Sequence, residues 1–341
     1  MHNLAHPPPA ARFPHVSNED QNTGNRPRAG MTGITPTSTS QYEGYQGTEL
    51  PPGTVVTGTS QFEIVQRLGE GGMSKVYKAF DRLMNRYIAL KVMKNDVPEW
   101  AHRHFRREAR MCASFMHHNL VHVSQVGTAE EFDVLWFAME YLRGKDVSWF
   151  IESGTPMGIP VILEIFSQVL DALRYVHLRR IVHCDIKPSN VFVTRDSHDP
   201  LLRVVKLLDF GVARDLSDLS SHNTHHIMGD PRYIAPEQTI PGNYIDHRAD
   251  LYALGMTFFE LVTGGRHPFE DLFDAHPRAL LQAHREREPL PVSHFLSDSV
   301  PAAKARAMDA FFAKACGKQV HHRFADALQM KEALIELAKL G

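Results

Sequence analysis

The pattern of hydrophobic and polar positions divides the chain into a strand-rich part and a helical part. From Phe62 onward, short runs rich in β-branched and aromatic residues are separated by Gly, Asp and Asn, which predicts consecutive antiparallel strands. Residues 101–116 instead repeat apolar positions at helical spacing, with arginines covering the other face. The predicted strands are FEIVQRLG (62–69), KVYKAFD (75–81), RYIALKVM (86–93), Leu120–Val126 and Val134–Glu140.

After Gly158 the apolar spacing is mainly helical, most clearly over 160–180, 250–265 and 331–340. The order of the two parts predicts an α+β fold. A small N-terminal antiparallel-sheet lobe with one helix precedes a larger, mainly helical C-terminal lobe.

Residues 1–60 are rich in Pro, Gly, Ser, Thr, Asn and Gln. Such a segment buries too little apolar surface to offset the chain entropy lost on folding. We therefore predict a disordered tail over 1–60, as a solvated linker rather than a phosphorylation platform. One folded domain is expected over 61–338, divided into lobes 61–142 and 143–338.

Composition narrows the class of protein. The 341 residues are 43% hydrophobic and 22% charged, which is typical of a globular protein. Thirty-seven basic residues against 39 acidic ones give a net charge of −2, which argues against recruitment by nucleic acid. Three widely spaced cysteines and the lack of a long apolar run predict a cytoplasmic protein without a membrane span.

A glycine-rich loop joins the first two strands. Glycines lack Cβ, so Gly69, Gly71 and Gly72 would let backbone N–H groups approach phosphate oxygens. The chain continues as a strand rather than a helix, which removes a dinucleotide-binding fold. An ordinary glycine hairpin remains the alternative.

Lys91 stands alone in an apolar strand, where an ammonium group needs an anionic partner. Glu108, in the middle of the predicted helix 101–116, is the natural partner. The alternative is that Glu108 is a surface carboxylate among Arg106, Arg107 and Arg110.

Three further motifs follow in the second lobe: His183-Cys184-Asp185-Ile186-Lys187-Pro188-Ser189-Asn190, Asp209-Phe210-Gly211 and Ala235-Pro236-Glu237. With these motifs the sequence resembles the eukaryotic-type (Hanks-type) protein kinase family over about 62–338, most closely the bacterial Ser/Thr kinases. The resemblance implies a bilobal kinase fold. It also implies transfer of the γ-phosphate of Mg-ATP to Ser or Thr hydroxyls of protein substrates, including the protein itself.

The resemblance also assigns site residues. Asp185 would accept or orient the hydroxyl proton, and Lys187 would contact the γ-phosphate. Asn190 and Asp209 would hold Mg²⁺, with Mn²⁺ as an alternative ion. In the ATP site, Lys91 held by Glu108 would contact the phosphates, and the glycine-rich loop would cover them; this loop is Leu68, Gly69, Glu70, Gly71, Gly72, Met73 and Ser74. The adenine ring would lie between the apolar residues Val76, Ala89 and Phe192, with Met139 at the back and the hinge residues Glu140 and Leu142 at its edge. Asp146 would lie near the ribose.

Three residues, His183, Asp250 and Arg323, receive scaffold roles from the same resemblance. His183 would pack beside Phe210, Asp250 would bind the backbone of the catalytic loop, and Arg323 would pair with Glu237. For Asp146 a helix-start cap is the favoured alternative to a ligand contact.

Cys184 replaces the arginine that usually precedes the catalytic aspartate. A thiol cannot dock a phosphorylated loop as arginine does, so we expect activity without loop phosphorylation, although Thr224 is placed as an autophosphorylation site. An inert buried thiol is favoured over a redox role. His222, His225 and His226 are interpreted as solvated residues rather than metal ligands.

Asp230 stands where Ser/Thr kinases typically carry a threonine. A carboxylate about 4 Å from Asp185 would repel it by roughly 4 kcal/mol, partly offset by Lys187. A weakly active or inactive nucleotide-binding pseudokinase is therefore the alternative function.

Overall fold

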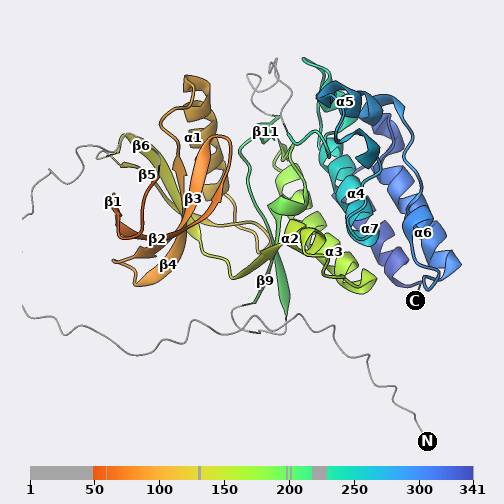
Figure 1. The fold of residues 1–341 in the computed structure, drawn as a ribbon, viewed down its shortest axis with the longest axis horizontal. Helices are drawn as coiled ribbons and strands as arrows, with labels where there is room; N and C mark the ends of the chain where they lie inside the picture. The colour runs from red at the N-terminus through yellow and green to blue at the C-terminus, as the bar shows by residue number, and fades with distance from the viewer. Residues whose placement is uncertain are drawn as a thin grey trace, which may run out of the picture. The chain divides into compact units, whose positions relative to one another are not determined.

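The computed structural model describes residues 49–58, 60–129, 132–196, 199, 202–216 and 229–340. Within these ranges a strand-rich lobe precedes a helical lobe, as Figure 1 shows. The predicted α+β class is confirmed. The predicted tail over 1–48 and the residues Thr224, His222, His225 and His226 lie outside the described residues.

The first lobe is built on a six-stranded antiparallel sheet in the order β1-β2-β3-β4-β6-β5. One face packs Phe62 edge-on against the fully buried Trp136, with ring centroids 5.1 Å apart. Helix α1 (Glu99–Ala113) packs on the sheet through Phe105, whose ring centroid lies 5.1 Å from that of Phe137. The strands are β1 (Val55–Thr57), β2 (Gln61–Glu70), β3 (Ser74–Asp81), β4 (Arg86–Met93), β5 (Val123–Ala129) and β6 (Val134–Glu140).

The range predicted for the tail, 1–60, is too long at its C-terminal end. Val55–Thr57 form β1, which pairs with β2 through Val56 opposite Phe62. Leu50 and Val56 are buried, and the Leu50 N–H donates to the Tyr77 hydroxyl at 3.2 Å. Three β-branched residues and the buried Leu50 add an edge strand, although the surrounding composition is polar.

The predicted strand Leu120–Val126 is displaced from the observed β5. The strand begins at Val123 and continues to Ala129, whereas Leu120 forms an isolated parallel bridge with Leu207 of the second lobe. The buried Leu120 therefore belongs to a contact between lobes, which local periodicity does not reveal.

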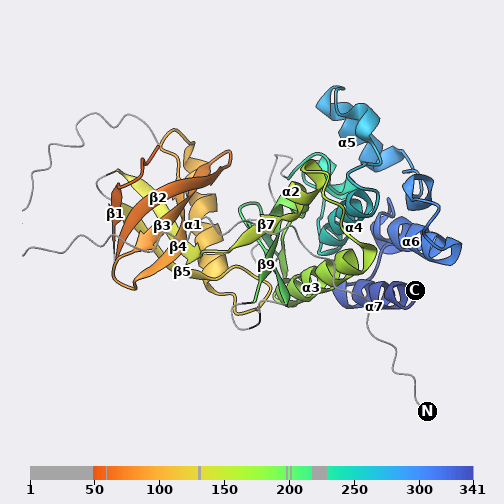
Figure 2. The same cartoon turned by 60° about the horizontal axis from the view of Figure 1, so that its bottom comes forward.

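The second lobe surrounds helix α4 (Arg248–Val262), whose residues from Ala249 to Leu261 are all buried. A helix that is buried on every side lies at the centre of its domain. Figure 2 shows α3 lying along α7, and the Phe166 and Phe258 rings pack α3 on α4 with centroids 5.5 Å apart. The other α-helices are α2 (Val147–Glu152), α3 (Ile159–His177), α5 (Pro277–Glu286), α6 (Ala302–Ala315) and α7 (Ala327–Ala338).

Short elements complete this lobe. Helix α4 ends before Gly264 and Gly265, whose φ values of +71° and +96° favour glycine. The remaining strands are β7 (Gly144–Asp146), β8 (Ile181–Val182), β9 (Val191–Arg195), β10 (Arg203–Leu207) and β11 (Arg214–Asp215), and the 3₁₀ helices are η2 (Pro188–Asn190), η4 (Pro236–Thr239), η5 (Glu270–Leu272), η6 (Val292–Phe295) and η7 (Val320–His322). Among the helices of the described ranges, none has both the length and the apolar character needed to cross a membrane.

Two buried histidines link α4, α5 and the segment after Gly229. The Tyr252 hydroxyl lies 2.9 Å from His284 Nδ1, and His267 Nε2 lies 2.8 Å from the Arg232 carbonyl oxygen. Burial lowers the pKa of His267 to about 4. Burial, together with the charges of His267 and Lys318, lowers the pKa of His284 to about 3.

We expect the free energy of unfolding to decrease as the pH falls from about 7 to 5. The ordinary histidine pKa is 6.5, so the unfolded chain binds more protons than the folded one in this window. Urea midpoints at pH 7.5, 6 and 5 measure the decrease. His267→Gln should have a smaller pH dependence than wild type, and a wild-type midpoint that is constant over this range would contradict the prediction.

Candidate active site

Asp250 holds the backbone at the start of the loop that contains Asp185. Its carboxylate accepts hydrogen bonds from the backbone N–H groups of His183 at 2.9 Å and Cys184 at 2.8 Å, and it lies 2.8 Å from His177 Nε2. Burial raises the pKa of Asp250, but the contact with His177 and the nearby His183 outweigh burial and lower it overall. Cys184 has a φ of +65°, a strained value for a residue with a side chain, and Asp250 fixes the N–H of that residue. The predicted scaffold role of Asp250 is confirmed.

Three donors surround the Asp185 carboxylate. Its Oδ1 accepts from the Asp230 backbone N–H at 2.9 Å. Its Oδ2 lies 2.9 Å from Lys187 Nζ and accepts from Asn190 Nδ2 at 3.2 Å. The same Asn190 amide donates to the Asp185 carbonyl oxygen at 2.8 Å. The structure thus brings Asp185, Lys187 and Asn190 together in one fixed cluster.

Lys91 connects the two lobes. Its Nζ lies 2.6 Å from Glu108 Oε1 and 3.1 Å from Asp209 Oδ1. Only 6% of the Glu108 side chain is exposed, so the surface alternative for Glu108 is wrong. Burial lowers the pKa of Lys91, but the charges of Asp209 and Glu108 outweigh burial and raise it overall. The Lys91 charge lowers the pKa of Asp209, whereas burial raises the pKa of Glu108.

Aromatic packing supports the Asp209 backbone. The His183 ring packs against Phe210 with centroids 4.5 Å apart, and His183 Nε2 lies 2.9 Å from the Leu208 carbonyl oxygen. The Phe115 ring also packs against Phe210, with centroids 4.9 Å apart. Asp209 itself has a φ of +58°, and its Oδ1 accepts from the Gly211 N–H at 3.2 Å. The predicted packing of His183 beside Phe210 is confirmed.

The glycine-rich segment forms the expected hairpin between β2 and β3. Glu70 pairs with Lys75, and the Gly71 N–H donates to the Ser74 carbonyl at 2.8 Å. A Cβ added to Gly69 or Gly72 would meet no atom within 4 Å, so the space beside both glycines is open.

The side chains at the end of this hairpin are engaged with the protein. Glu70 forms ion pairs with Lys94 at 2.7 Å and Arg67 at 3.2 Å. Lys75 lies 2.7 Å from Glu49, a residue that precedes the predicted domain. The carboxylates of Glu70 and Glu49 are therefore neutralised by basic side chains of the same lobe.

Four residues of the predicted nucleotide site share one face of the sheet. Val76 is opposite Lys91 in the β3–β4 ladder, and Ala89 is opposite Met139 in the β4–β6 ladder. Directly opposed residues point to the same face, as do Ala89 and Lys91, which are two positions apart. In the second lobe, Phe192 of β9 pairs with Asp146 of β7.

The two predicted hinge residues, Glu140 and Leu142, differ in whether their backbone N–H is already engaged. The Glu140 N–H already donates to the His122 carbonyl at 3.1 Å, and the Glu140 carboxylate lies 2.7 Å from Lys206 Nζ. Within the described ranges no hydrogen bond involves the Leu142 N–H. The Glu140 N–H is therefore already engaged within the protein, whereas the Leu142 N–H is available as a donor.

Asp146 caps helix α2. Its Oδ1 accepts from the Trp149 backbone N–H at 3.0 Å and from the Ser148 hydroxyl at 2.5 Å. The helix-start alternative is confirmed, and the cap leaves Oδ1 little capacity for a ligand.

Asp230 has a cationic partner that the sequence analysis did not identify. Its carboxylate forms a two-point interaction with Arg232, with Oδ1 3.3 Å from Nε and Oδ2 3.1 Å from Nη2. Burial raises the pKa of Asp230, but Arg232 and the charge of Lys187 outweigh burial and lower it overall. The partial offset expected from Lys187 is therefore joined by a second cation, Arg232. The Asp-x-Arg spacing in Gly229-Asp230-Pro231-Arg232 is the signal that could have revealed the pair.

Gly229 is a second residue that the sequence analysis missed. Its φ is +108°, and a Cβ there would lie 2.8 Å from the Cys184 carbonyl oxygen. The same carbonyl accepts from Gln238 Nε2 at 3.1 Å. Only glycine lets the segment approach closely enough for the Asp230 N–H to reach Asp185.

Two further expectations concern the helical lobe. Arg323 Nη1 and Nη2 each donate to a Glu237 oxygen at 2.7 Å, so the predicted pair is confirmed. The Cys184 thiol is buried, and burial raises its pKa, which favours the inert interpretation over the redox role.

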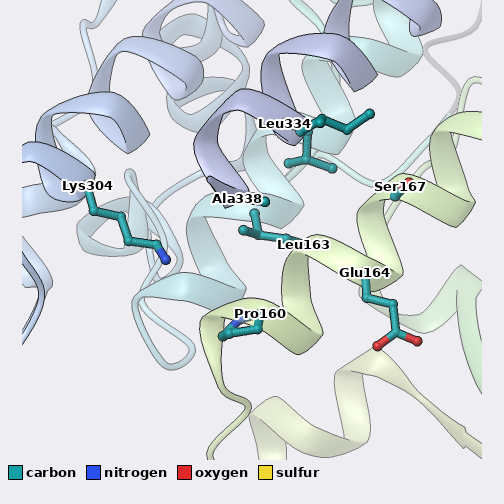
Figure 3. A pocket seen from close by; sticks show the side chains of 8 residues that line it. Pro160, Leu163, Glu164, Ser167, Lys304, Leu334 and Ala338 are labelled. Carbon is teal, nitrogen blue, oxygen red and sulfur yellow. The ribbon is translucent and has the colours of Figure 1, made fainter. Parts of the chain in front are cut away.

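A separate hollow lies between α3, α6 and α7 (Figure 3). It measures about 300 Å³, and its lining includes Leu163, Leu334 and Lys304. No predicted site residue lines it. This hollow is therefore distinct from the cluster around Asp185.

Residues 62–333 match the protein kinase domain family. Over 80% of its length, the chain is 38% identical to serine/threonine-protein kinase Pkn1 of Myxococcus xanthus and 37% identical to PknF of Mycobacterium tuberculosis. It covers only 38% and 55% of those proteins.

A solved structure is also similar. The PknI kinase domain of Mycobacterium tuberculosis is 27% identical to the chain, with a TM-score of 0.62, over 85% of this chain and 100% of that domain. The chain therefore belongs to the protein kinase domain family, in its eukaryotic-type branch with bacterial serine/threonine-protein kinases as relatives.

Proposed function

We propose that this protein transfers the γ-phosphate of ATP to serine or threonine hydroxyls of proteins, its own chain included. The observation that carries the proposal is the Asp185 carboxylate, held by the Asp230 N–H and the Asn190 amide beside the Lys187 ammonium. Phosphoryl transfer needs little covalent chemistry from the protein, so positioning and charge stabilisation are its main contributions. A fixed carboxylate next to a cation supplies both.

Asp185 and Lys187 have different roles in the transfer to the acceptor hydroxyl. Asp185 orients this hydroxyl and accepts its proton, because its carboxylate is anchored and follows Cys184, whose N–H is held by Asp250. Lys187 places a positive charge near the oxygens of the transferred phosphoryl group. Lys91, oriented by Glu108, holds the α and β phosphates.

The nucleotide would lie between the hairpin and the sheet face. The open space beside Gly69 and Gly72 fits phosphate oxygens, which their backbone N–H groups can approach. Val76, Ala89 and Met139 offer an apolar surface to the adenine ring, with Phe192 on the opposite side. The unpaired Leu142 N–H is the donor that we assign to the ring.

The residues present also fit a magnesium ion. Asn190 donates through Nδ2 to Asp185, and its Oδ1 accepts no hydrogen bond from a described residue. The Asp209 side chain is 49% exposed. Amide and carboxylate oxygens are the ligands that Mg²⁺ and Mn²⁺ prefer, so Asn190 and Asp209 would hold the ion. When bound, it neutralises charge on the phosphate oxygens.

Asp209→Asn tests the proposed activity. We expect incorporation of labelled phosphate from ATP into the protein and into a Ser/Thr peptide, and loss of at least about 99% of it in the variant. Mass spectrometry before and after phosphatase treatment identifies the modified residues. Equal incorporation by wild type and Asp209→Asn, or none by wild type, would contradict the proposal and favour the pseudokinase alternative.

Arg232 supports the active alternative, because it neutralises the carboxylate on which the pseudokinase argument rested. Arg232→Gln leaves Asp230 free to compete for Lys187, so we expect kcat to fall about tenfold, or ~1.4 kcal/mol of barrier. Asp230→Asn/Arg232→Gln should recover most of this loss. Peptide phosphorylation by both single variants and the double variant measures the coupling, and strictly additive effects would show that the pair has no such role.

A further inference from the structure

A short segment that precedes the matched domain packs on the sheet of the first lobe. The family match begins at residue 62, whereas residues 49–57, here named the strap, already belong to the folded lobe and end in the edge strand β1 (Figure 1). Leu50 is buried in the same apolar core as Tyr77. Tyr77 follows Val76 on β3, so this core lies on the face of the sheet opposite to that of Val76 and Lys91.

The first residue of the strap holds two basic side chains at the base of the glycine hairpin. Glu49 Oε2 lies 2.7 Å from Lys75 Nζ on β3 and 3.1 Å from Arg67 Nη1 on β2. Only 10% of the Lys75 side chain is exposed, although 52% of the Glu49 side chain is. The hydrogen bond with Glu49 raises the pKa of Lys75, as expected for an ammonium group that has gained an anionic partner.

The carboxylate at the end of β2 fastens the hairpin to β4. Glu70 stands directly opposite Lys75 in the β2–β3 ladder, yet its carboxylate lies 2.7 Å from Lys94 Nζ. The Lys94 backbone N–H donates to the Met73 carbonyl oxygen at 2.9 Å. Lys94 directly follows β4, the strand that carries Lys91. These two contacts of Lys94 therefore fix the hairpin relative to Lys91.

A competition between two carboxylates for Lys75 connects the strap to the hairpin. An ammonium group that is nine-tenths buried needs an anionic partner, because leaving it unpaired is costly. Glu49 supplies this partner in the structure. Without the Glu49 charge, Glu70 is the carboxylate that stands opposite Lys75. A new Glu70–Lys75 pair would take Glu70 away from Lys94 and loosen the hairpin.

We propose that Glu49 is a positioning residue of the glycine hairpin. By occupying Lys75, it keeps Glu70 on Lys94 and holds the glycine backbone at a fixed place beside Lys91. A hairpin that is already in place loses less conformational freedom when a nucleotide binds, so the strap strengthens ATP binding. The effect on ATP rests on the proposed kinase function, whereas the effect on the hairpin does not.

Glu49→Gln tests the proposal, because glutamine keeps the size of the side chain but removes its charge. Without nucleotide, we expect the amides of 68–75 to exchange hydrogen at least about threefold faster than in wild type. A nonhydrolysable ATP analogue with Mg²⁺ should bind about three- to tenfold more weakly, and the KM for ATP should rise likewise, while kcat changes by less than about twofold. Glu63→Gln is the matched control and should behave like wild type, because Glu63 pairs with Arg82 at 3.0 Å at the other end of the β2–β3 ladder.

The competition for Lys75 also predicts a rescue. In Glu49→Gln/Lys75→Met no cation at position 75 draws Glu70 away from Lys94, so exchange in the hairpin should return to within about twofold of wild type. The proposal is overturned if Glu49→Gln exchanges like wild type, or if the double variant exchanges as fast as the single one. Because exchange is measured without nucleotide, either result stands whether or not the protein binds ATP. A wild-type protein that does not bind the ATP analogue would instead contradict the proposed kinase function.

Discussion

Replacing Asp185 by Asn will lower kcat for peptide phosphorylation by between about 10² and 10⁴-fold. The variant side chain keeps the size of the carboxylate but loses its charge and one acceptor oxygen. It cannot accept from the Asp230 N–H at one atom and from Asn190 and Lys187 at the other, as Asp185 does. It also cannot take the proton of the acceptor hydroxyl.

The distribution of this loss distinguishes a catalytic residue from a binding residue. The KM for ATP should change by less than about threefold, because Lys91 and the glycine hairpin remain intact. Steady-state rates over a range of ATP and peptide concentrations provide both values. A variant that keeps more than a tenth of the wild-type kcat would refute the role assigned to Asp185.

Replacing Arg323 by Met will lower the free energy of unfolding by about 3–5 kcal/mol. The Arg323 guanidinium is fully buried, and besides Glu237 it donates to the Gly317 carbonyl at 2.7 Å and the Arg248 carbonyl at 3.1 Å. Methionine fills a similar volume but leaves the Glu237 charge buried without a partner. Breaking a buried pair in this way costs more than the pair contributes to stability.

Urea denaturation of Arg323→Met beside Arg278→Met measures this cost. Arg278 lies exposed on α5, so its replacement should change stability by less than about 0.5 kcal/mol. Glu237→Gln, which keeps hydrogen-bonding atoms, should fall between the two. A loss below about 1 kcal/mol in Arg323→Met would show that the helical lobe does not depend on this pair.

Much of the fold could be read from local patterns. Strand β6 has the predicted bounds Val134–Glu140, and β4 begins and ends with the predicted run 86–93. Both strands are buried over most of their length, so β-branched and aromatic residues are concentrated there. Helices α3, α4 and α7 overlap the predicted ranges because their apolar residues pack in the core, which produces the helical spacing in the sequence.

The errors arose where a pairing partner, rather than the local pattern, decides the structure. Val55 and Val56 form a strand because β2 offers them a free edge, which composition does not show. Leu120 was assigned to a strand, but it is buried by its contact with Leu207. The partner of Val56 is Phe62 of β2, across the predicted end of the tail, and the partner of Leu120 is Leu207 in the other lobe.

By itself, the sequence determined the kinase motifs and their order, because each motif is a short run whose residue types perform one chemical task. It also predicted the pair Lys91–Glu108, since an isolated charge in an apolar strand requires a partner, and its resemblance to the kinase family implied the pair Arg323–Glu237. The tertiary structure alone decided how the departures from the family are accommodated. Asp230 is neutralised by Arg232 and contributes its backbone N–H to Asp185, an arrangement set by the left-handed turn at Gly229. Such contacts depend on where the backbone carries each atom, which residue types alone do not specify.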